Sequence, residues 1–517
     1  MSKSINQLKI GVFLSYMQMA LSIIINLIYT PLMLRTLGQS EYGLYNTVSS
    51  TISMLSLLSL GFGSGYIRYY SIYKKEGDNE SIYKLNGLFL IIFTIIGLIG
   101  LVCGLWLSNN LRFVFDKGLT THEYSVARVL MLLLTVNLAL SFPMSVFSNI
   151  ISANEKYVFL KLLGMLKTVG GPLITIPVLL MGYGSIALVS VTLTISIITD
   201  ILYFIYVIFI LKNRFIFHGF EKGLFKSLFV YTSFIAINLI VDQINWNIDK
   251  LLLGRFQGTT SVAIYSVAYT LYQCYMTLST SISGVFTPRI HRIVNETGED
   301  VLQRRIRLTD LFIKVGRIQF LLLGLVVSGI IFFGKPFIYF WAGAGYNQSY
   351  YVVLLLTIPA TIALIQNIGI EIQRAENKHQ FRSVVYLIMA CINLVLTIFL
   401  CQKYGAIGAA IGTAISLIVA NGVIMNIYYH KKCDIDILLF WKNIIRMSVG
   451  FIIPIIFGVT VMSTINLYSI WTLMIVICLY TIIYCTSMWF LGMNKYERKL
   501  IQKPIKEIFR RRYDKNS

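Results

Sequence analysis

Long apolar stretches alternate with short polar ones along almost the whole chain. A helix needs about twenty residues to cross the hydrocarbon core of a bilayer, so apolar stretches of that length predict membrane-spanning helices. Charged and turn residues divide the chain into fourteen such stretches, at about 10–34, 42–67, 85–107, 125–150, 157–181, 184–211, 225–253, 262–288, 311–333, 350–371, 382–402, 404–429, 444–464 and 468–491. The pattern therefore predicts an all-α integral membrane protein with about 14 transmembrane helices.

Lysine and arginine are distributed unevenly around these stretches. With a cytoplasmic N-terminus, 35 of the 44 basic residues fall on the cytoplasmic side, eight fall on the outer side, and Lys167 lies within the fifth stretch. Cytoplasmic loops of membrane proteins carry an excess of positive charge, so this bias predicts that the N- and C-termini are both cytoplasmic. The net charge of +22 is then a signal of topology, and we expect no nucleic-acid partner.

Four short matches recur at a nearly constant offset of 220 to 222 residues. They pair Leu44-Tyr45 with Ile264-Tyr265, Ile67-Arg68-Tyr69 with Pro288-Arg289-Ile290, Ala153 to Lys156 with Ala375 to Lys378, and Tyr183 to Ile186 with Tyr404 to Ile407. Because six predicted spans separate equivalent positions, the two halves have the same orientation and are related by an axis along the membrane normal. The repeat predicts four parts: a six-helix bundle at 1–212, a second six-helix bundle at 213–430, two additional transmembrane helices at 431–493, and a basic cytoplasmic tail at 494–517.

The composition is typical of a membrane protein and gives no sign of an enzyme. Hydrophobic residues make up 56% of the chain and charged residues 13%, with a mean hydropathy of +0.73, which is too apolar for a soluble protein of this length. The sequence contains no C-x-x-C pair, no side chains at zinc-ligand spacing, no nucleophile motif and no G-x-x-x-x-G-K-S/T string. We therefore predict no catalytic residue, no metal site, no cofactor and no ATP site.

Several motifs, in this order and spacing, resemble those of a known group of membrane proteins. The motifs are Leu37-Gly38-x-x-x-Tyr42-Gly43-Leu44-Tyr45, Gly61-Phe62-Gly63-Ser64-Gly65-Tyr66-Ile67-Arg68, Asp249-Lys250-Leu251-Leu252-Leu253-Gly254 and Tyr404-Gly405-Ala406-Ile407-Gly408-Ala409-Ala410. On these motifs the chain resembles the polysaccharide and O-antigen flippases, which move lipid-linked oligosaccharides. Their superfamily of multidrug, oligosaccharidyl-lipid and polysaccharide exporters also holds the multidrug and toxin extrusion transporters and the lipid II flippases.

The resemblance implies a fold, a substrate and partners. The fold would be two six-helix bundles like those of the multidrug and toxin extrusion transporters, with two C-terminal helices added. The activity would be alternating-access transfer of undecaprenyl-diphosphate-linked oligosaccharide units from the inner to the outer leaflet of the cytoplasmic (inner) membrane. Such units are used to assemble O-antigen, capsule or exopolysaccharide, and the partners would be membrane lipids, a polysaccharide polymerase and glycosyltransferases.

Four cations near apolar stretches are candidates for binding the diphosphate of such a substrate, which requires a hydrated cationic cavity. They are Arg68, Lys167, Lys250 and Arg289. The repeat makes Arg68 and Arg289 equivalent, at the cytoplasmic ends of the second and eighth spans. Both arginines also fit a simpler interpretation, as anchors that reach the lipid headgroups.

Three carboxylates in apolar stretches are candidates for ion coupling, since a charge at that depth is costly unless it is paired or functional. They are Asp200, Asp242 and Asp249. Asp200 could pair with Lys167 or take up a proton. The spacing of Asp242, Asn245 and Asp249 predicts one shared, water-lining helix face, although Asp249 also fits a position at the outer membrane boundary.

Two other functions remain open from the sequence. A cation-coupled multidrug antiporter on the same fold would use an acidic, apolar pocket, whereas the ionisable residues here include several cations. A membrane polymerase or transferase would need a large external catalytic loop, and the longest predicted outer loop is only about seventeen residues, 108–124. The residues therefore favour transport of an anionic substrate.

Overall fold

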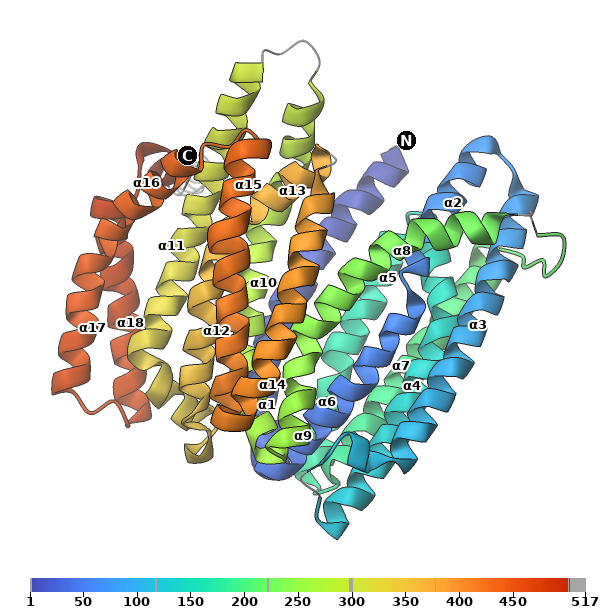
Figure 1. Cartoon of the computed structure of the whole chain (residues 1–517), viewed down its shortest axis with the longest axis horizontal. Coiled ribbons are helices and arrows are strands. Elements are labelled where there is room, and N and C mark those ends of the chain that lie inside the picture. The colour runs from blue at the N-terminus through green and yellow to red at the C-terminus, as the bar shows by residue number, and fades with distance from the viewer. Residues whose placement is uncertain are drawn as a thin grey trace, which may run out of the picture. The chain divides into compact units, whose positions relative to one another are not determined.

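The computed structural model describes residues 2–116, 119–220, 223–296, 301–376, 378–500 and 502, and this part of the chain is helical without strands. The α helices, labelled in Figure 1 where there is room, are α1 (Ser2–Met54), α2 (Phe62–Glu76), α3 (Asn79–Asn109), α4 (Thr121–Ala153), α5 (Tyr157–Met165), α6 (Gly171–Leu180), α7 (Gly184–Ile205), α8 (Leu224–Gln243), α9 (Asp249–Phe256), α10 (Thr259–Asn295), α11 (Val301–Trp341), α12 (Ser349–Leu364), α13 (Asn367–Ala375), α14 (His379–Leu417), α15 (Met425–Lys432), α16 (Ile437–Ser448), α17 (Ile452–Thr464) and α18 (Ile470–Ser487). Wider π-helical turns occur at η3 (Leu166–Gly170), η4 (Tyr206–Ile210), η5 (Ile244–Ile248), η7 (Ile418–Ile424) and η9 (Met488–Gly492). The predicted all-α membrane fold is confirmed.

Nine helices in the described part of the chain are long and apolar enough to cross a membrane, or up to eleven if each of two bent pairs is one span. Two of the nine, with 67 and 53 residues, far exceed the roughly twenty that one crossing needs. They are Ile10–Glu76 and Gln380–Lys432, and each contains a non-helical glycine, Gly38 (φ 73°) or Gly405 (φ 58°), at which the chain bends. Each is therefore long enough for two crossings, and the count of fourteen stays a prediction.

The internal contacts divide the chain into two compact units. The first unit comprises Met1–Thr270 with Tyr386–Thr413, and the second comprises Leu271–Val385 with Ala414–Ser517. The four predicted parts of the chain follow the sequence repeat instead, and their boundaries stay predictions. Most of the predicted basic tail, 503–517, lies outside the described residues.

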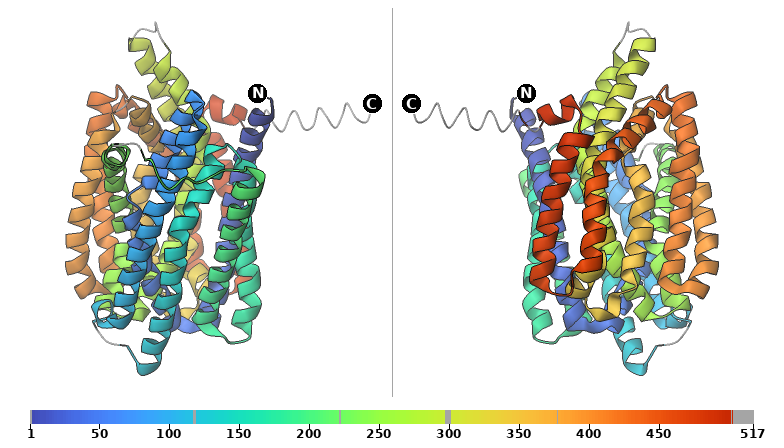
Figure 2. Two further views of the ribbon diagram at one scale, coloured as in Figure 1. Left: turned by 90° about the vertical axis from the view of Figure 1, so that its right-hand side faces the viewer. Right: turned by 90° about the vertical axis from the view of Figure 1, so that its left-hand side faces the viewer.

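Small residues let helices of the first unit approach one another closely. Helices α3 and α4 lie side by side (Figure 2, left), and a side chain on Gly104 of α3 would meet Thr135 of α4 at 2.2 Å. In the same way, a side chain on Gly43 of α1 would lie 1.9 Å from the carbonyl oxygen of Thr259, at the start of α10. Membrane helices associate through such close packing, because lipid provides no hydrophobic driving force between them.

A buried ion pair joins four segments of the second unit. The Arg317 and Glu497 side chains are 4% and 3% exposed, and two hydrogen bonds of 2.5 and 3.0 Å connect them. The guanidinium also donates to the backbone carbonyl oxygens of Asn443 and Gly492, each at 2.9 Å. Arg317 thereby joins α11 to α16, to the end of η9 and to the segment after it, in the region where α17 and α18 pack along α11 (Figure 2, right).

Arg317→Ala would leave the Glu497 carboxylate buried without its partner, and breaking a buried pair in this way costs about 3–5 kcal/mol. We expect a clearly lower unfolding temperature for the purified protein in detergent, measured from the loss of its helical circular dichroism. The matched control is Arg374→Ala, which removes a pair with Glu371 whose arginine is 62% exposed, and we expect it to change little. Equal unfolding temperatures for the two variants would show that the buried pair does not stabilise the fold.

Candidate functional site

Lys167 and Asp200 form an ion pair within the first unit. The Lys167 Nζ lies 3.5 Å from the Asp200 Oδ1, and the side chains are 38% and 15% exposed. Lys167 lies in η3, just before Pro172, which has no N–H to donate to a preceding carbonyl group, and this loss favours a local change of helical geometry. Of the two roles left open for Asp200, pairing with Lys167 is present in the structure, and the pair compensates two charges that apolar helices would otherwise hold at high cost.

Asp249 is buried at the start of α9, with a side chain only 2% exposed. Its Oδ2 accepts hydrogen bonds from the Tyr265 hydroxyl at 2.5 Å and from the Thr413 hydroxyl at 3.0 Å. Among the described residues, its Oδ1 has no hydrogen-bond partner. One carboxylate oxygen is thus held in place by two hydroxyl groups, while the other is buried without such a bond among the described residues.

Two more polar side chains of α14 extend the group around Asp249. The Thr397 hydroxyl donates to the Asn393 Oδ1 at 3.3 Å, and the Asn393 amide reaches the Thr413 hydroxyl at 3.5 Å. Carboxylate, amide and hydroxyl oxygens are ligands that hard cations accept. The described residues contain no cluster of three or more His, Cys, Asp or Glu side chains that could hold a metal ion, so this oxygen group depends on a single carboxylate.

The residues that surround Asp249 carry only a weak signal in the sequence. Tyr265 belongs to one of the repeat matches, but no role in the site was predicted for it, and Asn393, Thr397 and Thr413 were missed. Their only common signal is a polar side chain within a long apolar stretch. Hydroxyl side chains are common in such helices because they can bond to the preceding turn, so this signal does not single them out.

A π-helical turn changes the arrangement predicted for Asp242, Asn245 and Asp249. The predicted shared face requires a regular α-helix, whereas η5 interposes a wider turn between Asp242 and Asp249. Asp249 faces Tyr265 and Thr413 instead of water, and Asp242 is half-buried on the preceding helix. The prediction of one water-lining face is therefore wrong for Asp249 in this conformation.

Two of the predicted cations lie over aromatic rings. The Arg68 guanidinium of α2 is exposed and lies 4.4 Å from the ring centre of Tyr231 on α8. The Lys250 ammonium is half-buried and lies 4.5 Å from the ring centre of Tyr269. Both contacts are favourable cation–π interactions. A guanidinium stacked on a ring keeps its N–H edge accessible to phosphate oxygens.

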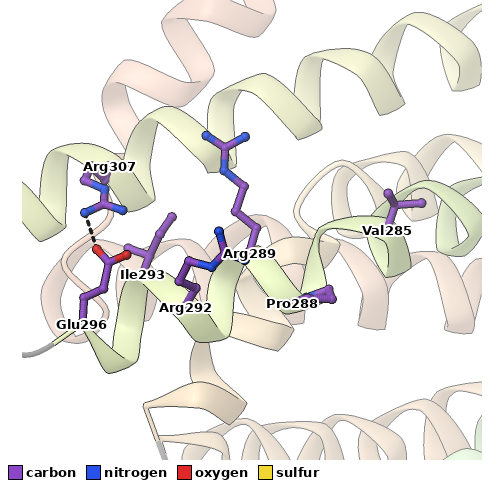
Figure 3. Close-up of a pocket in the computed structure, with 7 residues that line it drawn as sticks. All are labelled: Val285, Pro288, Arg289, Arg292, Ile293, Glu296 and Arg307. Carbon is purple, nitrogen blue, oxygen red and sulfur yellow. Dashed lines mark hydrogen bonds and ion pairs between the residues drawn. The ribbon is translucent and has the colours of Figure 1, made fainter. Parts of the chain in front are cut away.

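Arg289 lies in a pocket of about 530 Å³ between α10 and α11 (Figure 3). The lining residues are Val285, Pro288, Arg289, Arg292, Ile293, Glu296 and Arg307. Arg307 donates to Glu296 at 2.6 Å, and this hydrogen bond lowers the pKa of the Glu296 carboxyl group. The described lining of this pocket thus contains three arginines and one carboxylate, and the sequence analysis predicted only Arg289 among them as a binding residue.

The fold is that of a class of multi-helix membrane transporters. A solved structure of the lipid II flippase MurJ, in an inward-closed conformation, matches 95% of this chain and 99% of its own with a TM-score of 0.71 and 17% identity. An inward-facing multidrug resistance transporter of the MATE family in the MOP superfamily matches 81% and 95% of the two chains, with a TM-score of 0.61 and 14% identity. At these identities the likeness defines the fold alone.

Within this class, the chain belongs to the polysaccharide biosynthesis protein family, whose model matches residues 8–294. A Shigella flexneri protein named as an O-antigen transporter is 19% identical over 412 residues, which cover 78% of this chain and 92% of that protein. The family resemblance predicted from the motifs is confirmed.

Exchanging the two charges tests the pair in η3 and α7. We expect Lys167→Asp and Asp200→Lys each to reduce the yield of folded protein, because each leaves two like charges among apolar helices. The double variant should recover most of that yield, because it restores opposite charges at the two positions. The coupling energy of an exposed or half-exposed pair is only about 1 kcal/mol. The measurement is the monodisperse fraction after detergent extraction. A double variant no better than the worse single variant would contradict the pairing.

Proposed function

We propose that this protein is a flippase for undecaprenyl-diphosphate-linked oligosaccharide units. It moves them from the inner to the outer leaflet of the cytoplasmic membrane, where they are assembled into O-antigen, capsule or exopolysaccharide. The observation that carries the proposal is the match of residues 8–294 to the polysaccharide biosynthesis protein family. The name of the Shigella flexneri relative supports an envelope polysaccharide as the end product.

The proposed transport cycle uses the two predicted six-helix bundles as alternating halves. In proteins built from such repeats, the halves rock about a shared path that opens to one side of the membrane at a time. The N- and C-termini are cytoplasmic in this proposal, as the distribution of basic residues predicts. A polysaccharide polymerase and glycosyltransferases act before or after the flippase as its partners.

The diphosphate of the substrate binds cations in this proposal. Arg68 and Arg289 offer guanidinium groups at exposed positions, and guanidinium matches the planar geometry of phosphate oxygens. Lys250 and Lys167 are half-buried, and Lys167 is shared with Asp200. The two arginines are therefore the better candidates for first contact with the substrate, and the two lysines for contacts along the path.

Asp249 is the strongest of three candidates for ion coupling, because it is buried and one carboxylate oxygen lacks a hydrogen-bond partner among the described residues. A proton or a small cation at this oxygen would neutralise the charge, and its release would restore a buried charge that favours a different packing of the helices. Asp200 is already paired with Lys167, and Asp242 lies before the π-helical turn.

A cation-coupled multidrug antiporter is the second candidate function. It is favoured by the fold shared with a multidrug resistance transporter and by the buried carboxylate at Asp249. The cations at Arg68, Lys250 and Arg289 do not fit a cationic cargo, since like charges repel. We therefore place this function second.

Deletion of the gene in its host tests the proposal. We expect accumulation of an undecaprenyl-diphosphate oligosaccharide in lipid extracts and loss of the surface polymer, both measured by mass spectrometry. Complementation with Arg68→Ala or Arg289→Ala should restore less polymer than the wild-type gene does, by about tenfold if each arginine contributes one charge-assisted hydrogen bond. Unchanged glycans with new sensitivity to cationic drugs would instead support the antiporter.

Asp249→Asn tests ion coupling, because the amide keeps the size of the side chain and can still accept a hydrogen bond, but cannot bind a proton or balance a cation. In proteoliposomes with a fluorescent lipid-linked sugar, we expect flipping by the wild-type protein to accelerate when a proton or sodium gradient is imposed. The variant should lose this acceleration, while Asp242→Asn should keep it. Equal acceleration in the wild-type protein and Asp249→Asn would exclude Asp249 as the coupling residue.

A further inference from the structure

The pocket between α10 and α11 contains more positive charge than its own residues neutralise. Among the described lining residues, Glu296 is the single carboxylate, and it is bonded to Arg307 at 2.6 Å (Figure 3). Within the same described part, neither Arg289 nor Arg292 has a carboxylate oxygen within ion-pair distance. The described lining therefore contains three guanidinium groups and one carboxylate, an excess of positive charge that suits an anion with more than one negative charge.

The lining of the pocket changes from apolar to cationic along α10. Val285, Arg289, Arg292 and Glu296 are spaced by three or four residues, so they lie along one face of the helix, with Pro288 next to Arg289. Val285 is 60% exposed at one end of this face, and the arginines follow within one to two turns. The apolar end of this face, at Val285, lies next to the cationic part of the pocket. This arrangement suits an amphipathic ligand that has a hydrocarbon chain next to an anionic group.

The depth of the pocket agrees with such a ligand. On α11, Arg307 and Lys335 are 28 residues apart, or about 42 Å along a helix. A bilayer with its headgroups is about 40–45 Å thick. With the predicted topology, the exposed Lys335 would lie at the outer headgroups, and Arg307 would then lie at the level of the phosphate groups of the opposite leaflet. This is the level at which a membrane lipid presents its diphosphate.

We propose that this pocket is a docking site for the diphosphate group of the polyprenyl-linked substrate in the cytoplasmic leaflet, with Arg289 and Arg292 as its phosphate ligands. Glu296 holds Arg307 at the rim and limits how strongly the pocket retains the anion. The inference rests on the proposed function and deepens it, because it assigns an entry site to the substrate. The volume of about 530 Å³ lies within the range of small-ligand sites, roughly 300–1,000 Å³.

Binding of undecaprenyl diphosphate to the purified full-length protein, measured by native mass spectrometry in detergent, tests the docking site. We expect Arg289→Ala and Arg292→Ala each to weaken binding by about fivefold to tenfold, since each removes one charge-assisted contact at an exposed site. Arg305→Ala is the matched control, because it removes the same charge from the same hairpin outside the lining, and it should change binding less than about twofold. Glu296→Gln should strengthen binding, which no loss of folding can imitate.

Competing ligands identify the source of the anion. Undecaprenyl diphosphate should displace a bound fluorescent analogue at much lower concentration than either inorganic pyrophosphate or phosphatidylglycerol does. Equal competition by pyrophosphate would overturn the lipid assignment in favour of a free phosphate compound. Equal competition by phosphatidylglycerol would overturn it in favour of any anionic lipid.

The same experiment separates this inference from the proposed function. If the wild-type protein binds undecaprenyl diphosphate and the pocket variants bind it equally well, the docking site is wrong and the flippase proposal stands. If the wild-type protein does not bind this lipid and the deletion strain accumulates no lipid-linked sugar, the proposed function itself is wrong.

Discussion

Charges inside this protein must be compensated by other protein groups, because the hydrocarbon core of a membrane contains no water to solvate them. The second unit meets this constraint with Arg317, whose guanidinium binds Glu497 and two backbone carbonyl groups. The first unit meets it with the Lys167–Asp200 pair. The charge of Asp249 is compensated only in part, since its Oδ1 lacks a hydrogen-bond partner among the described residues. That incomplete compensation is what distinguishes a candidate functional group from a structural one.

The fold class could be predicted because a bilayer requires apolar stretches of a known length, and these stretches are visible in the sequence. The Lys167–Asp200 pair could be anticipated because each charge is isolated within its own apolar stretch. The role of Arg317 could not be anticipated, because a basic residue near a cytoplasmic loop looks like a topology signal. In addition, its partner Glu497 follows Arg317 by 180 residues. The surroundings of Asp249 could not be predicted either, because most of them come from α14, whose Thr413 follows Asp249 by 164 residues.

Backbone geometry explains further differences between expectation and structure. Gly184 and Gly405, which the sequence repeat makes equivalent, both have positive φ angles, 67° and 58°. Glycine adopts this conformation without steric cost, so these two equivalent positions have the same requirement for glycine. The π-helical turn at η5 has no such signature in the apolar pattern. It changes which side chains share a face, and for this reason the predicted alignment of Asp242 with Asp249 does not hold.

The length of α11 between Arg307 and Lys335 relates this protein to the thickness of its membrane. Both side chains are charged and are therefore more stable in the polar headgroup layers than in hydrocarbon, and the helix between them has a fixed length. In a bilayer with longer acyl chains the helix must stand more upright or the lipid around it must become thinner, at a cost of fractions of a kcal/mol per Å of mismatch. Acyl-chain composition, which cells adjust with temperature, would therefore act on the depth of the proposed docking site in the membrane.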